Sequence, residues 1–441
     1  MRVLFILKAF PFPPKQGIDL PISQIIKALA RHHTVDILIV SKNKAETEAA
    51  SSERLVQKAL VPEAVGQILN IQAGQCTRAK RVLGELMLQQ PAYFSRGFSA
   101  ETIQAVWAAA GQRTYDVAWV SPISGLGLLA QCQQMGICLA RQIALGYNDV
   151  VTTTYFDSLR ELLSGYVVRD WQRLLQGIRT PRIWWHERRY FQRVEFVHLQ
   201  TPLEVARANA VLKGIKSRPV LLAAQNGRKT ELEKVVYEAP NSSKVLFMTH
   251  LTGGRAKESA WFLQQVWPLI LQQHPTAELM IAGKPPDENG AIARSLPPSV
   301  RVLGYVDNLV ELYGSVRLAV VPIAHSTGLI NRALDAITAG VPLVATSRVL
   351  STIAGCEPGR DAITADTATD FANAVCSLLG NNTLSQTYSA AGRALAKQQP
   401  TWQESTEAII AGLEKIAAKS MASLNDSCEP SSYSAVSDLT A

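Results

Sequence analysis

Arg317-Leu-Ala-Val-Val-Pro-Ile-Ala-His-Ser-Thr-Gly-Leu-Ile-Asn-Arg-Ala-Leu-Asp-Ala-Ile-Thr-Ala-Gly-Val-Pro-Leu-Val-Ala-Thr346 is the stretch that decides the fold. It opens with an apolar run, 318–323, that has the length and branching of a buried strand, and a polar turn follows at 325–328. Apolar residues then recur at helical spacing, at positions 330, 333, 334 and 337. Gly340 predicts the end of this helix, and 343–345 predicts another buried strand. This order predicts a strand-helix-strand crossover of a parallel sheet.

The start of this helix is a candidate binding site. In such a crossover the helix begins at the carboxyl end of the first strand, where its N–H groups and the positive end of its dipole face ligands. Gly328, Leu329 and Ile330 therefore offer backbone N–H groups to a diphosphate. The carboxylate of Asp335 can accept two hydrogen bonds from the adjacent hydroxyls of a ribose. These residues indicate a nucleotide site, and the alternative is an ordinary helix with a solvated aspartate.

The segment from Gly328 to Thr346 resembles the donor-site helix of retaining glycosyltransferases of family 4, which have the GT-B fold. In that family a glycine-bearing turn leads into a basic residue, Leu, Glu, Ala and then Ala-Gly-x-Pro-Val-Val-Ala-Thr. Arg332 matches the basic position, and Asp335 matches the glutamate that holds the ribose. Thr327 stands where many members have a second glutamate, which contacts the transferred sugar or its phosphates. The resemblance implies an α/β protein of GT-B architecture, with two Rossmann-like, doubly wound parallel-sheet domains that face each other across a cleft.

The composition allows two domains but leaves the partner open. With 441 residues the chain is long enough for two cores, and it contains no run of about 18 apolar residues that would predict a transmembrane helix. The N-terminus reads as a first strand and not as a signal peptide, so we expect a cytoplasmic protein. The six cysteines form no C-x-x-C pair, which indicates neither a zinc site nor a disulfide framework. A net charge of +8 suits nucleic acid, an anionic membrane or phosphorylated substrates.

The N-terminal half repeats the strand and helix pattern. Residues 45–115 are expected to be largely helical, and strands are predicted at 2–7, 34–40, 115–121, 138–145, 194–199 and 219–224. The loop after the first strand carries one glycine, Gly17. By the resemblance Gly17 contacts the donor diphosphate, and a surface turn is the alternative.

The residues after the strand at 138–145 are the catalytic candidates. In the family this strand end commonly carries His-Asp, which faces the donor sugar and the acceptor. Here Asn148 takes the histidine position and Asp149 matches the acid. The resemblance therefore makes Asp149 the candidate for orienting the acceptor hydroxyl, and a turn-stabilising aspartate is the alternative.

Residues 159–193 are rich in arginine and aromatic residues. Such a segment suits a helix on anionic lipid headgroups, because the rings enter the interface while guanidinium groups pair with phosphates. This contact would bring an enzyme to a lipid-linked acceptor. The alternative is an amphipathic helix pair whose arginine stems pack on the domain. No nucleic-acid-binding module is recognised, so we expect no nucleic-acid partner.

The C-terminal half adds further donor-site candidates. Arg255 and Lys257 follow Gly253-Gly254 after a strand predicted at 244–248, and they can bind phosphate oxygens. A flexible basic loop is the alternative. By the resemblance Tyr305, Val306 and Asp307, after a strand at 300–303, lie by the nucleobase.

The domain boundary is predicted in a polar run. Gln225-Asn226-Gly227 resembles the Pro-Asn-Gly that closes the N-terminal domain in the family. We predict an acceptor-side domain, a linker, a nucleotide-sugar-binding domain, a helix that packs toward the first domain and a disordered tail, at 1–228, 229–243, 244–400, 401–419 and 420–441.

These features predict a retaining glycosyltransferase that moves a sugar from a nucleotide diphosphate sugar to a hydroxyl acceptor. It would act in polysaccharide or glycolipid synthesis, and a lipid-linked molecule is one candidate for the acceptor. It would work in the cytoplasm or peripherally on the inner face of the membrane. The chain has no Asp-x-Asp motif, which agrees with a metal-independent reaction in which cations and a helix N-terminus stabilise the departing diphosphate. No cofactor besides the nucleotide sugar co-substrate is expected. The alternative, motivated by Thr327 and Asn148, is a non-catalytic GT-B-fold protein that binds a nucleotide sugar or serves as a scaffold.

Overall fold

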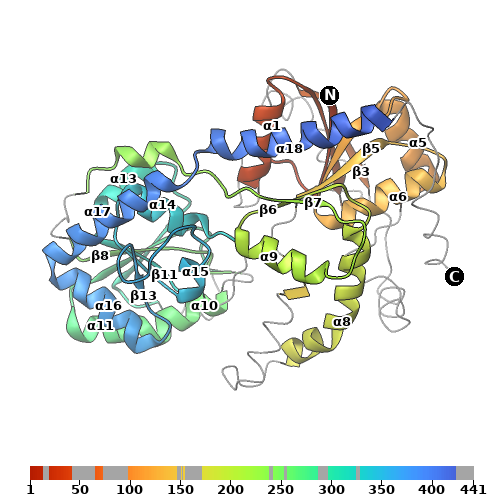
Figure 1. The fold of residues 1–441 in the computed structure, drawn as a ribbon. Helices are drawn as coiled ribbons and strands as arrows, with labels where there is room; N and C mark the ends of the chain where they lie inside the picture. The colour runs from red at the N-terminus through yellow and green to blue at the C-terminus, as the bar shows by residue number, and fades with distance from the viewer. Residues whose placement is uncertain are drawn as a thin grey trace. The chain divides into compact units, whose positions relative to one another are not determined.

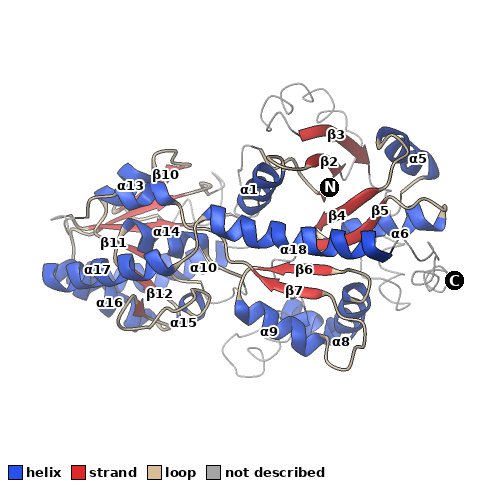
Figure 2. Cartoon of the chain, turned by 45° about the horizontal axis from the view of Figure 1, so that its top comes forward, coloured by secondary structure: helices blue, strands red, loops and turns tan. Residues whose placement is uncertain are grey.

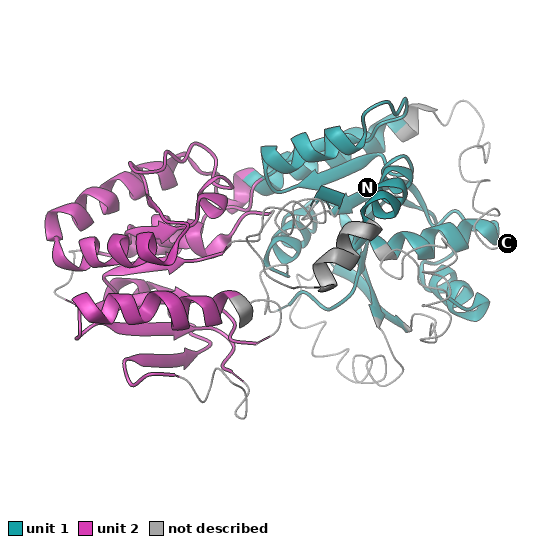
Figure 3. Ribbon diagram, turned by 90° about the horizontal axis from the view of Figure 1, so that it is seen from below, with its two compact units in different colours: residues 1–224, 405–441 teal, residues 225–404 magenta. Residues whose placement is uncertain are grey.

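The computed structural model describes residues 1–12, 19–41, 65–72, 98–146, 150, 152–153, 171–237, 242–252, 256–286, 296–323 and 328–423. The chain divides into two compact units, coloured separately in Figure 3: unit 1 is 1–224 with 405–441, and unit 2 is 225–404. Each unit is built on one sheet in which neighbouring strands are parallel. Two parallel-sheet α/β domains were predicted, and this fold class is confirmed.

The sheet of unit 1 has seven strands in the order β3-β2-β1-β4-β5-β6-β7. The order reverses at β1, so successive strands are added first on one side and then on the other, as in doubly wound sheets. The strands are β1 Arg2–Leu7, β2 Thr34–Ser41, β3 Val65–Gln72, β4 Tyr115–Ser121, β5 Ala140–Gly146, β6 Phe196–Leu199 and β7 Val220–Ala223.

Helices cover both faces of this sheet. Alternate residues of β1 point to opposite faces, so Val3 and Phe5 pack in one core while Leu4 and Ile6 pack in the other. The first core is closed by α1 Asp19–Leu29 and by the C-terminal helix α18 Trp402–Ser423, which lies along the sheet in Figure 2. The second core is closed by α5 Ala100–Ala109, α6 Leu126–Gln134, α8 Trp171–Phe191 and α9 Pro202–Val211.

The sheet of unit 2 has six strands in the order β10-β9-β8-β11-β12-β13. They are β8 Lys244–Met248, β9 Glu278–Ala282, β10 Val300–Gly304, β11 Leu318–Val321, β12 Leu343–Ala345 and β13 Ile363–Thr364. In Figure 1 one face carries α13 Leu309–Ser315 and α14 Asn331–Ala339, and the other carries α11 Trp267–Gln273 and α16 Ala368–Gly380. The remaining helices are α10 Ala256–Trp261, a π-helical turn at Phe262–Val266, α15 Ser347–Leu350 and α17 Asn382–Gln398.

The crossover predicted for residues 317–346 is present as β11, α14 and β12. Ala319 pairs with Leu343 in parallel register, so the two strands are neighbours. Gly340 ends α14 in the left-handed conformation, at φ 70°. A side chain at this position would be strained, which explains the glycine stop.

Two features differ from a simple reading of the sequence. The expectation of a largely helical segment at 45–115 is wrong for β3, an edge strand that pairs with β2. In addition, part of the stretch predicted as a linker packs on unit 2. It forms a 3-10 helix at Thr230–Lys234, and Leu232 and Val235 are buried in the core with α14.

A buried histidine in β6 makes the stability of unit 1 depend on pH. His198 is buried and its Nε2 lies 2.8 Å from the carbonyl oxygen of Ala224, to which the neutral ring donates. Burial lowers the pKa of His198 to about 4. This pKa lies below that of a histidine in the unfolded chain, so the neutral His198 stabilises the fold. Its contribution to the free energy of unfolding is fully present above about pH 6.5 and is lost as the pH falls toward 4.

We therefore expect His198→Gln to flatten the acid side of the stability profile. The wild type should lose about 2 kcal/mol between about pH 7 and 5 through this residue alone, and the variant should not. Urea unfolding followed by tryptophan fluorescence measures this difference. His32→Gln, at an exposed position of the same unit, controls for the loss of an imidazole. Equal slopes for wild type and His198→Gln would contradict the prediction.

Candidate functional site

The start of α14 lies at the carboxyl end of β11, where the sequence placed the diphosphate. Gly328, Leu329 and Ile330 are all buried and lead directly into the helix. Ile330 is the N-cap residue, and its side chain has no polar atom that could cap the first turn. A helix end of this kind attracts an anion.

The carboxylate of Asp335 is buried and paired. Asp335 is 5% exposed, and its Oδ2 lies 2.9 Å from Nζ of Lys229. Burial raises the pKa of Asp335, and the nearby Lys229 ammonium opposes this rise. The alternative of a solvated aspartate is therefore wrong. The sequence pattern did not single out Lys229, because it is one of many polar residues in the run predicted as a linker.

Arg332 is fixed at the end of the neighbouring strand β8. Its guanidinium donates a hydrogen bond to the carbonyl oxygen of Met248, the last residue of β8. Tyr313 contacts both of these residues, because its hydroxyl lies 3.1 Å from Sδ of Met248 and 3.4 Å from the carbonyl oxygen of Arg332. Burial, and then the charge of Asp335, raise the pKa of Tyr313 well above its usual value. The site thus combines a fixed cation, a neutral phenol and a buried carboxylate.

Hydrogen bonds join the carboxyl ends of β8, β9 and β10, which lie side by side in the sheet. Thr249 N–H donates to the carbonyl oxygen of Ala282 at 2.9 Å, and Gly283 N–H donates to that of Gly304 at 2.7 Å. Gly283 has φ 134°, and a Cβ there would lie 2.1 Å from the carbonyl oxygen of Thr249, so the close approach requires glycine.

Tyr305 stands on this edge as an exposed aromatic side chain. It is 67% exposed, and its ring centroid lies 6.2 Å from that of His250. Nδ1 of His250 accepts a hydrogen bond from Lys284 N–H at 3.0 Å. Val306 is half-buried and packs on the core. His250 escaped the sequence analysis, and its only signal was its position just after the β8 strand.

Several candidates lie outside the described residues: Gly17, Asn148, Asp149, Arg255 and Thr327. Lys257 lies in α10, where the structure describes the backbone and not the side chain. The described candidates of unit 2, at 305–306, 328–330, 332 and 335, all lie in α14 or in segments that follow the carboxyl ends of strands.

Two buried glutamates of unit 1 hold the segment that follows Asn148 and Asp149. Glu204 Oε2 accepts from Val150 N–H at 2.8 Å, and Glu187 Oε2 accepts from Thr152 N–H at 3.1 Å. Both glutamates are 0% exposed. Glu204 lies in the first turn of α9.

The described part of the chain contains no group of three or more His, Cys, Asp or Glu side chains placed to hold a metal ion. Among the same residues, no helix combines the length and apolar character needed to cross a membrane.

A segment of unit 2 matches a known protein family. Residues 242–381 match the family model described as glycosyl transferases group 1. Sucrose-phosphate synthase from Thermosynechococcus elongatus shares the fold with a TM-score of 0.63 and 15% identity, over 95% of this chain and 99% of that one. Anabaena HepE in complex with UDP has a TM-score of 0.62 and 14% identity, over 94% of this chain and 100% of that one. No curated protein matches the chain in sequence.

A third solved structure is a mutant of S. aureus TarM in complex with Fondaparinux, alpha-GlcNAc-glycerol and UDP. It has a TM-score of 0.62 and 9% identity, over 94% of this chain and 100% of that one. The two parallel-sheet units thus define the GT-B class, as the resemblance indicated. Within this class, residues 242–381 match the model of glycosyl transferases group 1, and the resemblance to glycosyltransferases is confirmed.

Proposed function

We propose that the protein transfers a sugar, with retention, from a nucleotide diphosphate sugar to a hydroxyl acceptor. The observation that carries this proposal is the start of α14 in the unit that matches group 1 glycosyl transferases. There Arg332 reaches the end of β8, the N-cap side chain does not cap the first turn, and the buried carboxylate of Asp335 lies one turn beyond Arg332. These are the groups that a nucleoside diphosphate needs, namely an anion site and an acceptor for hydroxyl groups.

The donor would bind with its diphosphate at Gly328, Leu329, Ile330 and Arg332. Its base would lie near Tyr305 and Val306, where an exposed ring offers a stacking surface. The ribose would bind at Asp335. UDP is named for HepE and TarM, which supports a uridine nucleotide as the first ligand to test.

In this proposal Lys229 keeps the carboxylate of Asp335 ionised. Its ammonium, 2.9 Å from Oδ2, favours the ionised carboxylate against the effect of burial. An ionised carboxylate accepts strong hydrogen bonds from ribose hydroxyls. Lys229 would therefore support nucleotide binding without itself contacting the reacting atoms.

The reaction would proceed by front-face attack without a metal ion. The bond between the sugar and the diphosphate breaks, the acceptor oxygen bonds to the same carbon on the same face, and its proton passes to the departing phosphate. Asp149, with Asn148 beside it, would orient the acceptor hydroxyl. Arg255, Lys257, Gly17 and Thr327 would contact the phosphates or the sugar, and the positive groups would stabilise the charge that develops on the diphosphate. The acceptor we favour is lipid-linked, in polysaccharide or glycolipid synthesis.

Thermal unfolding with UDP, GDP, ADP and their sugars tests the donor site. We expect one nucleotide to raise the midpoint, since a ligand at about 100 times its Kd stabilises by about 2.7 kcal/mol. Arg332→Gln should reduce the ligand-induced shift, measured from the midpoint of the variant itself. Arg301→Gln, at an exposed arginine of β10, should keep it.

Release and transfer of the labelled sugar are then measured with the nucleotide that binds. No shift with any nucleotide would overturn the proposal. Binding without donor hydrolysis or transfer would favour the alternative, a non-catalytic protein that binds a nucleotide sugar. Thr327 and Asn148, which replace the glutamate and the histidine of the family, motivate this alternative.

A further inference from the structure

Helix α8 exposes two adjacent tryptophans on the surface of unit 1. Trp184 is 40% exposed and Trp185 is 45% exposed, although most large apolar side chains of this unit are buried. Ile183 and Phe191 of the same helix are buried in the core. The fold therefore uses one side of α8 for packing and leaves an aromatic pair on the other. Figure 1 shows α8 beside α9 on this part of the unit.

Each exposed ring carries a guanidinium group on its face. Cζ of Arg188 lies 4.5 Å from the ring centroid of Trp184, and Cζ of Arg189 lies 5.1 Å from that of Trp185. The spacing of four residues brings both pairs together on the helix. Arg188 also donates to the carbonyl oxygens of Val211 and Lys213, at the end of α9. Its described partners are thus an aromatic ring and two carbonyls, none of which neutralises its charge.

The described segments that form and follow α8 carry far more basic than acidic residues. Residues 171–193 contain six arginines and a single acidic residue, Glu187, whose side chain is buried. Residues 205–230 contain no aspartate or glutamate, and Lys213, Lys216 and Arg218 are exposed there. The pKa of His186 is lowered to about 4, by burial first and then by the charges of Arg182 and Arg189. The basic aromatic face is defined here as Trp184, Trp185, Arg188, Arg189 and Lys213.

We propose that the basic aromatic face docks the protein on a membrane that contains anionic phospholipids. Indole rings favour the headgroup region, because the ring is apolar and its N–H remains hydrated. Guanidinium and ammonium groups bind the lipid phosphates, and segments without exposed carboxylates do not repel them. Two adjacent exposed indoles favour a bilayer over a soluble polyanion, which would need the charges alone. This binding is independent of glycosyl transfer.

Sedimentation of the full chain with lipid vesicles tests the proposal. We expect strong binding to phosphatidylcholine vesicles that contain about one third phosphatidylglycerol, and about tenfold weaker binding to phosphatidylcholine alone. W184A/W185A should bind the anionic vesicles at least about tenfold more weakly. Met135→Ala, which removes another exposed apolar side chain of unit 1, should bind like the wild type. No nucleotide or acceptor is present, so the result does not depend on the proposed activity.

A second variant guards against a folding effect of the tryptophan changes. R189Q/K213Q keeps both indoles and Arg188, and it should weaken binding and reduce its salt dependence. Brominated lipids should quench the wild-type tryptophan fluorescence more than that of W184F/W185F. Unchanged vesicle binding by both double variants would overturn the proposal, as would binding to heparin without binding to either vesicle.

Discussion

Gly227→Ala is expected to be among the most destabilising single changes in unit 2. A Cβ at this position would lie 2.2 Å from the backbone nitrogen of Trp402 and 2.3 Å from its Cα, with the carbonyl carbon of Thr401 at 2.5 Å. These are backbone atoms, which cannot turn away as the end of a side chain would. Two stretches of main chain would have to separate to admit one methyl group.

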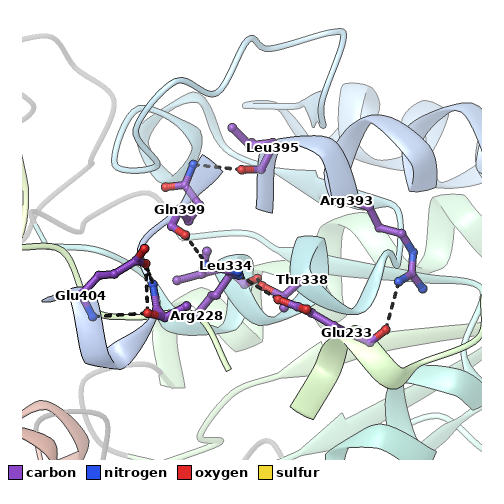
Figure 4. Close-up of polar contacts among 9 residues, drawn as sticks. Arg228, Glu233, Leu334, Thr338, Arg393, Leu395, Gln399 and Glu404 are labelled. Carbon is purple, nitrogen blue, oxygen red and sulfur yellow. Dashed lines mark hydrogen bonds and ion pairs between the residues drawn. The ribbon is translucent and has the colours of Figure 1, made fainter. Parts of the chain in front are cut away.

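The two stretches hold each other through several hydrogen bonds. Arg228 N–H donates to the carbonyl oxygen of Pro400 at 2.8 Å, and its Nη1 donates to that of Gln399 at 2.6 Å. Gln225 Nε2 donates to Oε1 of Gln399 at 2.8 Å. Figure 4 draws Arg228 together with Gln399 and Glu404. The chain enters unit 2 and leaves it along these neighbouring stretches, so separating them would disturb both.

We expect Gly227→Ala to lower the free energy of unfolding by at least about 3 kcal/mol, at the upper end of overpacking effects. Urea unfolding of the variant and the wild type measures this loss. Gly314→Ala is a matched control in α13. The nearest atom to a Cβ there is Cγ1 of Val235, at 4.0 Å, so the helix should gain about 0.5 to 1 kcal/mol. Similar midpoints for Gly227→Ala and the wild type would contradict the clash.

Local patterns predicted most of the fold because most strands, unlike β3, carry an apolar run of their own. The apolar runs at β1, β4, β8 and β11 are buried on both faces, as parallel strands are. β3 was missed because it is an edge strand with polar residues, in the sequence Val-Gly-Gln-Ile-Leu-Asn-Ile-Gln. Its position depends in part on a contact distant in sequence, since Gln67 N–H donates to Oδ1 of the buried Asp36 at 2.7 Å.

In the candidate site, too, local patterns predicted the elements, and contacts between distant segments were missed. The sequence predicted that α14 begins after β11 and that Asp335 lies on it, because both follow from spacing. It did not show that Lys229 meets Asp335, that Arg332 reaches the end of β8, or that His250 lies by Tyr305. Which charge meets which depends on how distant segments pack, and no local period contains that information.

Asp335→Ala is expected to weaken both the fold of unit 2 and the binding of the nucleotide. Lys229 is 20% exposed in its side chain and would keep its charge without the carboxylate. Breaking a mostly buried pair in this way costs about 3 kcal/mol. The nucleotide would also lose its proposed ribose contact. A single variant cannot separate these two effects, because an unfolded protein binds no nucleotide.

The double variant K229M/D335L separates them. It removes both charges and retains apolar volume, so its free energy of unfolding should return to within about 1 kcal/mol of the wild type. Its midpoint should nevertheless fail to rise with the nucleotide that stabilises the wild type. Arg301→Gln, which breaks an exposed ion pair in the same unit, should change neither property. A double variant that the nucleotide still stabilises would exclude Asp335 as the ribose ligand.

Lys229→Met tests the state of the carboxylate through pH. Burial already raises the pKa of Asp335 above its usual value, and without Lys229 the pKa should rise further. A raised pKa of an acid in the folded state contributes stability at low pH, which is lost as the pH rises through that pKa. The free energy of unfolding of Lys229→Met should therefore fall more steeply with rising pH than that of the wild type, and K229M/D335L should not show this fall. Parallel pH profiles for Lys229→Met and the wild type would mean that Lys229 does not control the ionisation of Asp335. In that case the lysine would serve packing alone, and the proposed support for ribose binding would have to come from Arg332 and the helix start.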